Sequence, residues 1–310
     1  MEIFSDLDFN QENKTVVTIG MFDGVHKGHQ ELLNKVIEQA LLNNADSVVV
    51  TFWPHPRMVL HQDEQALRFL TSLEEKCMIF NHAGIKKVVI LPFNAELASL
   101  TTDEFAKNIL VKKLNISHLI VGFNHRFGKG DKHQFSDYQS LANKYNFGIS
   151  KVEPVSDKGV KISSTQIRNY LINNLLDEAN SQLGYHYTLK GQVVTGNQLG
   201  RRINYPTANI LLEDINKLIP KEGVYATRCQ VEGKWYNSMT NIGVRPTIIE
   251  NAANLTIETH LFDFSGDLYN QSISVAFVKK LREEQRFESI DLLKQQLLLD
   301  EQSARAILTT

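Results

Sequence analysis

The chain has 310 residues, enough for two domains with buried cores, and a formal net charge of −2. That charge gives no general attraction to nucleic acid or to an anionic membrane. Two cysteines give no disulfide framework, and no apolar run approaches the length of a membrane span. The first residues are acidic and lack an apolar targeting core. We therefore expect a cytoplasmic protein, a monomer or weak homo-oligomer, that binds small anionic molecules and neither nucleic acid nor membrane.

The first predicted element is a buried strand at 16–19, followed by a glycine-rich turn at 20–29 and a helix at 30–42. Free N–H groups at a helix start attract phosphate, and glycines let a ligand approach the backbone. His26 and His29 add ring nitrogens that can be neutral or cationic near pH 7. The turn therefore suits a nucleotide triphosphate. A structural role and metal ligation remain alternatives for the two histidines, although no third zinc-type ligand stands at suitable spacing.

The rest of the first half alternates apolar strands with helices. Further strands are predicted at 47–52, 88–91, 119–121 and 149–155. Capping boxes at Ser72-Leu73-Glu74-Glu75 and Thr101-Thr102-Asp103-Glu104 predict two helix starts, Gly84 can end the first of these helices, and Ser136 starts another. This alternation predicts right-handed βαβ crossovers and a doubly wound parallel sheet.

Two loops follow the predicted strands directly. Trp53-Pro54-His55-Pro56-Arg57 is held by two prolines, and is either a stiff connector or a wall of a ligand pocket at the strand ends. The segment 122–130 carries glycines, two phenylalanines and basic residues, which suit a nucleotide or an aromatic ring. A flexible surface loop is the alternative for this second segment.

The segment Lys161-Ile162-Ser163-Ser164-Thr165-Gln166-Ile167-Arg168 combines three hydroxyl groups at a helix start with an arginine one turn later. Ser163 with Gln166 can be a simple capping box. The same arrangement can bind phosphate oxygens, with Arg168 as a forked donor. We favour phosphate binding because the histidine turn lies upstream in the same chain.

From Tyr187 onward the pattern changes to short alternating runs separated by turns. The predicted strands are 188–194, 225–231, 255–261 and 272–278, and an amphipathic helix is predicted at 289–308. These features predict an antiparallel β-barrel with a covering helix. We place the boundary near Gly184, which divides the chain into domains 1–183 and 184–310.

Two features of this second part can carry chemistry. Thr207 and Asn209, after the stiffening Pro206, alternate onto one side and offer oxygen ligands to Mg²⁺ or phosphate, although such turns are common. Glu258 interrupts a strand-like run, and its carboxylate lies either on the solvated face or at a reacting group. Taken alone, its pattern favours the solvated face.

The chain resembles the prokaryotic bifunctional riboflavin kinase/FAD synthetase family along nearly its whole length. The matching segments, in family order, are 20–29, Thr51-Phe52-Trp53-Pro54-His55-Pro56-Arg57, Leu91-Pro92-Phe93, 162–168, Pro206-Thr207-Ala208-Asn209, Gly223-Val224-Tyr225, Asn241-Ile242-Gly243-Val244-Arg245-Pro246-Thr247, Glu258-Thr259-His260-Leu261 and 281–287. The resemblance implies a Rossmann-like FMN adenylyltransferase domain followed by a riboflavin kinase barrel.

The resemblance also implies two reactions. In the second domain ATP with Mg²⁺ phosphorylates riboflavin to FMN, with Glu258 as general base and Thr207 and Asn209 as metal and phosphate ligands. In the first domain FMN attacks a second ATP, which gives FAD and pyrophosphate, while His26 and His29 stabilise charge on the phosphates. Nucleotide or phosphate contacts are expected at Gly20, Phe22, Gly24, Gly28, Asn124, Ser163, Ser164, Arg168, Gly200, Thr207 and Asn209. Flavin contacts are expected at Pro54, His55, Pro56, Arg57, Phe123, Phe127, Tyr225 and Arg282.

The chain departs from the family pattern at two places. Asn124-His125 stands where an acidic and an aromatic residue are common, and Asn204 stands where glycine is common before the Pro-Thr-Ala-Asn segment. Asn204 strains the loop if a positive φ is required there. A flavin-binding regulatory protein with degenerate catalytic sites is therefore an alternative. A different nucleotidyltransferase, for example one acting on phosphopantetheine, is less consistent with the segments at 206–209 and 258–261.

Overall fold

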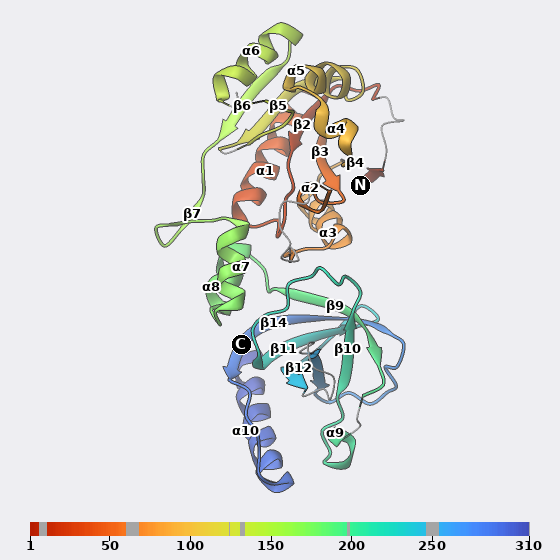
Figure 1. The fold of residues 1–310 in the computed structure, drawn as a ribbon, viewed down its shortest axis with the longest axis vertical. Coiled ribbons are helices and arrows are strands. Elements are labelled where there is room, and N and C mark those ends of the chain that lie inside the picture. The colour runs from red at the N-terminus through yellow and green to blue at the C-terminus, as the bar shows by residue number, and fades with distance from the viewer. Residues whose placement is uncertain are drawn as a thin grey trace. The chain divides into compact units, whose positions relative to one another are not determined.

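The computed structural model describes residues 1–5, 11–59, 68–123, 125–130, 134–196, 199–245 and 254–309. The chain forms two compact units, 1–164 and 165–310 (Figure 1). The second unit begins upstream of the boundary near Gly184 that the sequence predicts. In the described ranges, no helix combines the length and the apolar character that crossing a membrane requires.

The first unit contains a parallel sheet of six strands in the order β1-β4-β3-β2-β5-β6. The strands are β1 Glu2–Phe4, β2 Thr15–Ile19, β3 Asp46–Trp53, β4 Lys87–Pro92, β5 Ile116–Gly122 and β6 Gly148–Val152. The central strands are valine- and isoleucine-rich because helices cover both of their faces. The five strands predicted from the sequence are confirmed, and the short edge strand β1 is an addition.

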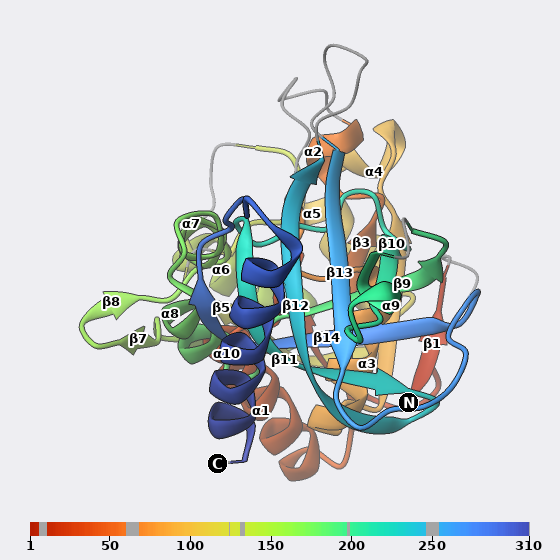
Figure 2. The same ribbon diagram turned by 90° about the horizontal axis from the view of Figure 1, so that it is seen from below.

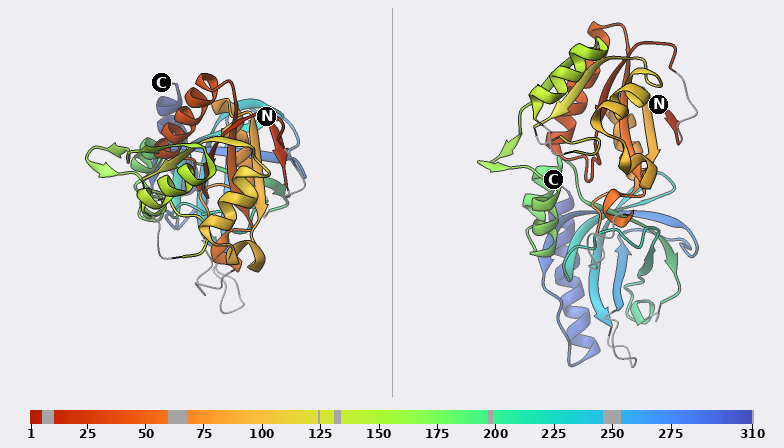
Figure 3. Two further views of the ribbon diagram at one scale, coloured as in Figure 1. Left: turned by 90° about the horizontal axis from the view of Figure 1, so that it is seen from above. Right: turned by 45° about the horizontal axis from the view of Figure 1, so that its top comes forward.

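Helices lie on both faces of this sheet, as a doubly wound fold requires (Figure 3). They are α1 Lys27–Leu42, α2 Pro56–Val59, α3 Leu73–Ala83, α4 Ala95–Ser99, α5 Thr102–Phe105, the π-helical η1 Ala106–Val111 and α6 Phe135–Tyr145. α1 and α3 pack on one face, and α4, α5, η1 and α6 pack on the other. The predicted capping boxes at Ser72 and Thr101 are present, and Gly84 ends α3 in the left-handed conformation, with φ 92°.

The second unit is built around a closed antiparallel barrel in the order β10-β13-β12-β11-β14-β9. Its strands are β9 Thr188–Val194, β10 Ala208–Leu212, β11 Gly223–Val231, β12 Lys234–Arg245, β13 Asn254–Leu261 and β14 Ser272–Arg282. The predicted barrel is confirmed, with β10 and β12 as additional strands.

A chain of buried hydroxyl groups lies inside the barrel and explains why β12 lacks a strong apolar signal. Thr227 Oγ1 lies 2.8 Å from both Ser238 Oγ and Thr240 Oγ1, and Thr240 Oγ1 lies 2.9 Å from Thr259 Oγ1. Because these polar groups bond one another, the barrel interior tolerates them without water.

The remaining elements are the hairpin β7 Ser156–Asp157 and β8 Val160–Lys161, and the helices α7 Ser164–Ile172, α8 Leu176–Leu183, α9 Leu199–Arg202 and α10 Ile290–Leu308. α10 packs along β11, β12 and β14 on the outside of the barrel (Figure 2). The predicted C-terminal helix is therefore confirmed, and the Ser289 hydroxyl caps it by accepting from Leu292 N–H.

Candidate active sites

The turn after β2 has an unusual backbone. Phe22 and Val25 have φ values of 50° and 33°, and Gly24 has φ 79°. A positive φ is costly for a β-branched residue such as Val25, and such conformations gather at ligand sites, where the surrounding structure holds them. The turn is therefore prearranged before a ligand arrives.

Asp23 supplies much of what holds this turn. Its buried carboxylate accepts from the backbone N–H groups of Leu70 and Thr71, at 3.0 and 3.1 Å through Oδ1. Its own carbonyl accepts from Ser164 Oγ at 2.8 Å. The structure thus brings Ser164, a predicted phosphate ligand at the start of α7, beside the histidine turn. Ser163 directly precedes α7, and Arg168 lies within it.

His26 and His29 form a stacked pair, with ring centroids 3.7 Å apart and an interplanar angle of 13°. His26 caps α1, and its Nδ1 accepts from the His29 backbone N–H at 3.3 Å. This bond places the proton of a neutral His26 ring on Nε2. A Cβ on Gly28 would lie 3.3 Å from the His26 ring, and one on Gly20 would lie 3.1 Å from the Phe22 ring, so both glycines give the aromatic rings room.

Both histidine rings are neutral at pH 7 in the ligand-free protein, although the sequence left a cationic pair open. Burial lowers the pKa of His26 to about 4, although the charge of Asp23 opposes this shift. Burial also lowers the pKa of His29 well below 6.5, and the positive charges of His26 and Lys76 add to the effect. The pair therefore offers neutral N–H donors.

Lys76 of α3 is a buried lysine beside this turn, with 3% of its surface exposed. Its Nζ donates to the Met21 carbonyl at 3.2 Å. Burial lowers the pKa of its ammonium group, while the negative charge of Asp23 raises it. Lys76 therefore both orients the turn and places a basic group close to the histidines.

The lowered histidine pKa values predict a specific pH response. Because His26 has an ordinary pKa of 6.5 when unfolded and one of about 4 when folded, the unfolded chain binds more protons between these values. The contribution of the neutral His26 ring to the free energy of unfolding is complete above pH 6.5. It is lost as the pH falls toward 4, and the loss is about 3 kcal/mol. NMR titration should find the His26 ring resonance, assigned by its absence in His26→Gln, changing near pH 4. A midpoint near 6.5 would contradict the buried, neutral ring.

The residues of the first unit that were predicted to contact flavin lie in several different local environments. The Trp53-Pro54 peptide bond is cis, the His55 ring lies 5.1 Å from that of Phe69, and Pro56 begins α2. Phe123 is 44% exposed after β5, with Lys161 Nζ 3.5 Å from its ring centroid. Asn124 and the side chain of Arg57 lie outside the described residues.

Phe127 and Tyr225 are core residues in this structure, although the sequence suggested flavin contacts for both. Phe127 is 5% exposed and packs against Phe105 and Tyr138. Tyr225, 2% exposed, packs against Phe277 in the barrel, and its hydroxyl donates to the Lys221 carbonyl. Their apolar contacts therefore give them packing roles.

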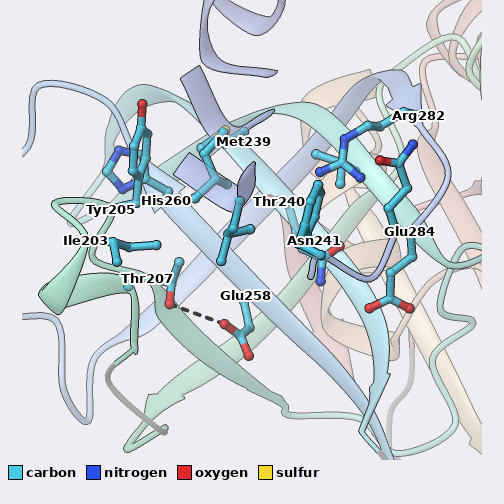
Figure 4. A pocket seen from close by; sticks show the side chains of 16 residues that line it. Ile203, Tyr205, Thr207, Met239, Thr240, Asn241, Glu258, His260, Arg282 and Glu284 are labelled. Atoms are coloured by element: carbon cyan, nitrogen blue, oxygen red, sulfur yellow. Dashed lines mark hydrogen bonds between the residues drawn. The ribbon is translucent and has the colours of Figure 1, made fainter. Parts of the chain in front are cut away.

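The second unit contains a pocket of about 320 Å³ (Figure 4). Its apolar wall comes from the loop after α9, from β12, from the segment between β14 and α10, and from α10: Ile203, Met239, Phe287, Leu293 and Leu297. Polar side chains lie at its other walls: Thr207 and Glu258 face each other, and Asn241, Arg282 and Glu284 lie together on another side. Such a volume, with mostly apolar walls and a few polar groups, suits a flat aromatic ligand with polar edges.

Thr207 and Glu258 meet at one end of this pocket. Thr207 Oγ1 donates to Glu258 Oε2 at 3.3 Å (Figure 4). Asn209 lies directly opposite Glu258 in the antiparallel ladder, so their side chains share a face of the barrel. Glu258 therefore lines the pocket while its side chain stays partly exposed. Hydroxyl and amide oxygens are ligands that suit Mg²⁺, so Thr207 and Asn209 fit that ion. Among the described residues, no group of three His, Cys, Asp or Glu side chains could hold a metal.

The loop that carries Thr207 depends on Gly200 and Asn204. A Cβ on Gly200 would lie 2.1 Å from the Tyr205 carbonyl oxygen, which explains the glycine. Asn204 has φ 65°, so the positive φ anticipated from the family pattern is present. Asparagine adopts this conformation more readily than other non-glycine residues, so the loop forms without a glycine at position 204. His260 Nδ1 lies 2.7 Å from the Pro206 carbonyl oxygen, and this contact holds the backbone directly before Thr207.

A smaller pocket lies on the other side of Thr207. Thr207 lines both pockets, and the smaller one also includes Arg201, Asp267 and Tyr269. The Arg201 guanidinium lies 5.5 Å from the Tyr269 ring centroid. Two ligands, one in each pocket, would therefore meet at Thr207.

Sequence reasoning missed several residues that organise these sites. Asp23 and His260 lie inside motifs that the sequence singled out, but nothing in the pattern distinguished them from their neighbours. Lys76 follows the capping box of α3 and reads as a solvated helix residue. Asp300 of α10 binds Arg282 but lies far from it in sequence, so no local signal could have found it.

Two family models match this chain, one in each half. A family model for FAD synthetase matches residues 8–166, and a family model for riboflavin kinase matches residues 183–308. Together they cover the parallel-sheet unit and the barrel unit.

Curated relatives match nearly the whole chain. The bifunctional riboflavin kinase/FMN adenylyltransferase of Escherichia coli strain K12 is 39% identical over 94% of this chain and 91% of its own. The enzyme of the same name from Bacillus subtilis strain 168 is 35% identical over 95% of this chain and 92% of its own. A crystal structure described as a macrolide-efflux protein from Streptococcus pneumoniae has a TM-score of 0.89 and 31% identity, and covers 98% of this chain and 99% of that one. That structure therefore shares the fold of the whole chain.

Proposed function

Because the chain belongs to the family of bifunctional riboflavin kinase/FMN adenylyltransferases, it converts riboflavin to FMN and FMN to FAD, and we propose a separate site in each unit for these two reactions. The kinase reaction takes place in the barrel around Thr207 and Glu258. Adenylylation takes place at the turn that carries His26 and His29. The observation that carries the kinase proposal is that Thr207 lines both barrel pockets and donates to Glu258.

Riboflavin occupies the larger barrel pocket, and the terminal phosphates of ATP reach Thr207 from the smaller one, which has a volume of about 80 Å³. The apolar walls accept the flavin ring system, while Arg282 offers donors to its oxygen atoms. The terminal ribityl hydroxyl reaches Glu258, which takes its proton as the hydroxyl oxygen attacks the γ-phosphorus of ATP. The bond from the γ-phosphorus to the bridging oxygen breaks, and ADP leaves.

Mg²⁺ fits the oxygen atoms of Thr207 and Asn209. When bound, it neutralises negative charge on the phosphates during transfer. The protein residues orient the ribityl hydroxyl and the phosphate chain, since such transfers depend chiefly on positioning and electrostatics. The bond between Thr207 and Glu258 keeps the carboxylate at the end of the pocket where that hydroxyl arrives.

The FMN phosphate, largely ionised at pH 7, attacks the α-phosphorus of ATP at the histidine turn, and pyrophosphate leaves. No protein base is needed for this attack. Neutral His26 and His29 donate to the phosphate oxygens, with Nε2 of His26 carrying its proton. Gly24 and Gly28 leave room for the phosphates, and Ser164 binds the departing pyrophosphate.

The product assay tests both reactions and the metal requirement. Purified protein with riboflavin, ATP and Mg²⁺ should yield FMN and FAD on chromatography, and EDTA should stop both reactions because the phosphates lose their counter-ion. FMN formation that continues unchanged in EDTA would contradict the proposed metal site. A flavin-binding regulatory protein would bind riboflavin without consuming ATP.

All substrates in this scheme are small molecules, which supports a cytoplasmic enzyme without nucleic-acid or membrane partners. Each proposed site is assembled within one chain, so a monomer or a weak homo-oligomer is sufficient for activity.

A further inference from the structure

A buried ion pair joins the C-terminal helix to the larger barrel pocket. Arg282 Nε lies 2.9 and 3.1 Å from the two carboxylate oxygens of Asp300, and Arg282 Nη2 lies 2.8 Å from Oδ2. The Asp300 side chain is only 4% exposed. Gln296, one turn earlier on α10, donates to Asp300 Oδ1 at 2.8 Å. Both oxygens of the carboxylate are therefore bonded, and its orientation is set.

The pair leaves part of the Arg282 guanidinium for the pocket. A guanidinium has five N–H donors. The bonds to Asp300 use Nε–H and one N–H of Nη2, and Nη1 donates to the Glu283 carbonyl at 3.0 Å. One N–H on each terminal nitrogen remains, and Arg282 lies at the pocket wall beside Asn241 and Glu284 (Figure 4).

α10 is also joined to the barrel by a second pair of the same chemistry. Arg305 Nη1 and Nη2 lie 2.7 and 2.9 Å from the carboxylate oxygens of Asp263. The Asp263 side chain is 77% exposed, and neither partner lines the larger pocket. An exposed pair contributes little stability. Among the residues that the structure describes, one arginine–aspartate pair thus lies at the pocket and another lies away from it.

We propose that Asp300 is a positioning residue of the riboflavin kinase site, acting through Arg282 to hold the guanidinium ready for oxygen atoms of the flavin. This inference rests on the proposed placement of riboflavin in the larger pocket. A free arginine side chain must lose rotamer freedom when it binds a ligand. Asp300 holds Arg282 in place before riboflavin arrives, which lowers that cost.

Kinetics of Asp300→Asn in the full chain test the proposal. The change keeps the size of the side chain but removes its charge. The KM for riboflavin should rise about ten- to a hundred-fold, because a displaced guanidinium no longer meets the flavin. The KM for ATP and the rate of FAD formation from supplied FMN should stay unchanged. Asp263→Asn is the matched control and should leave all of these values unchanged.

A double-mutant cycle separates positioning from general stability. If Asp300 acts through Arg282, Asp300→Asn should cause no further loss in an Arg282→Gln background. Any of three results would overturn the proposal. In the double mutant, the fold-increases in riboflavin KM of the two single mutants would multiply. In the single mutants, Asp300→Asn would leave the riboflavin KM unchanged, or Asp263→Asn would raise it equally. An unchanged riboflavin KM in Arg282→Gln would instead overturn the flavin placement.

If Asp300→Asn does not fold, Asp300→Glu tests the same role of Asp300. The longer side chain keeps the ion pair but displaces the guanidinium, so the riboflavin KM should again rise while the KM for ATP does not. An unchanged riboflavin KM in this variant would also overturn the proposed role of Asp300.

Discussion

Glu258→Gln should lower the kcat for riboflavin phosphorylation by about 10²- to 10⁴-fold, because a side-chain amide cannot take the proton of the ribityl hydroxyl. The substitution is nearly isosteric, and its amide oxygen can still accept the bond that Thr207 Oγ1 makes at 3.3 Å. We therefore expect the loss in kcat, with little change in the KM for riboflavin. Single-turnover assays with chromatographic separation of riboflavin and FMN measure it.

Adenylylation provides the internal control for that result. FAD formation from supplied FMN should be unchanged in Glu258→Gln, since the proposed adenylylation site lies in the other unit. Glu232→Gln, which alters an exposed carboxylate in the turn between β11 and β12, should affect neither activity. If Glu258→Gln keeps its kinase rate, Glu258 is not the base. If it abolishes both activities in a folded protein, the two-site scheme is wrong.

His29→Ala should lower FAD formation by about 10²- to 10³-fold while leaving FMN formation intact. The change removes one neutral donor to the phosphates, and the loss of a single prearranged donor typically has this size. It also removes the ring on which His26 stacks at 3.7 Å, so part of the loss comes from a less ordered His26. Following FAD production from FMN and ATP measures the effect.

The matched control is His82→Ala, which removes an exposed histidine whose Nδ1 lies 2.7 Å from the Met78 carbonyl in the same unit. It should change neither activity. A His29→Ala protein that makes FAD at the normal rate would remove the histidine pair from the mechanism. Loss of FMN formation as well would show that the two units do not divide the reactions as proposed.

Local sequence determined most of the secondary structure. The capping boxes at Ser72 and Thr101 and the helix end at Gly84 are formed by residues within a few positions of one another, so their patterns could be read directly. The valine-rich strands of the parallel sheet could be read for the same reason, because burial on both faces requires apolar side chains throughout. β12 was not predicted from the sequence, because its inward-facing hydroxyl groups, such as those of Ser238 and Thr240, are hydrogen-bonded only by partners on other strands.

The sites were only partly readable from sequence. The histidine turn and the Thr207 loop stood out because glycine, proline and histidine limit the backbone and the chemistry available. Phe127 was expected to contact flavin because aromatic residues near glycines suit a ligand, and Tyr225 because of the family resemblance, although the same patterns occur in a core. In the structure Phe127 is 5% exposed and Tyr225 is 2% exposed, so both pack in a core.

The order of the motifs was enough to see the family resemblance, and that resemblance implied two domains and two ATP-dependent reactions. The three-dimensional fold alone decided the protonation of the histidines and the orientation of Arg282. Desolvation and Coulomb interactions depend on distances in space, and Lys76 and Asp300 reach their partners only after strands and helices far apart in the chain have packed together.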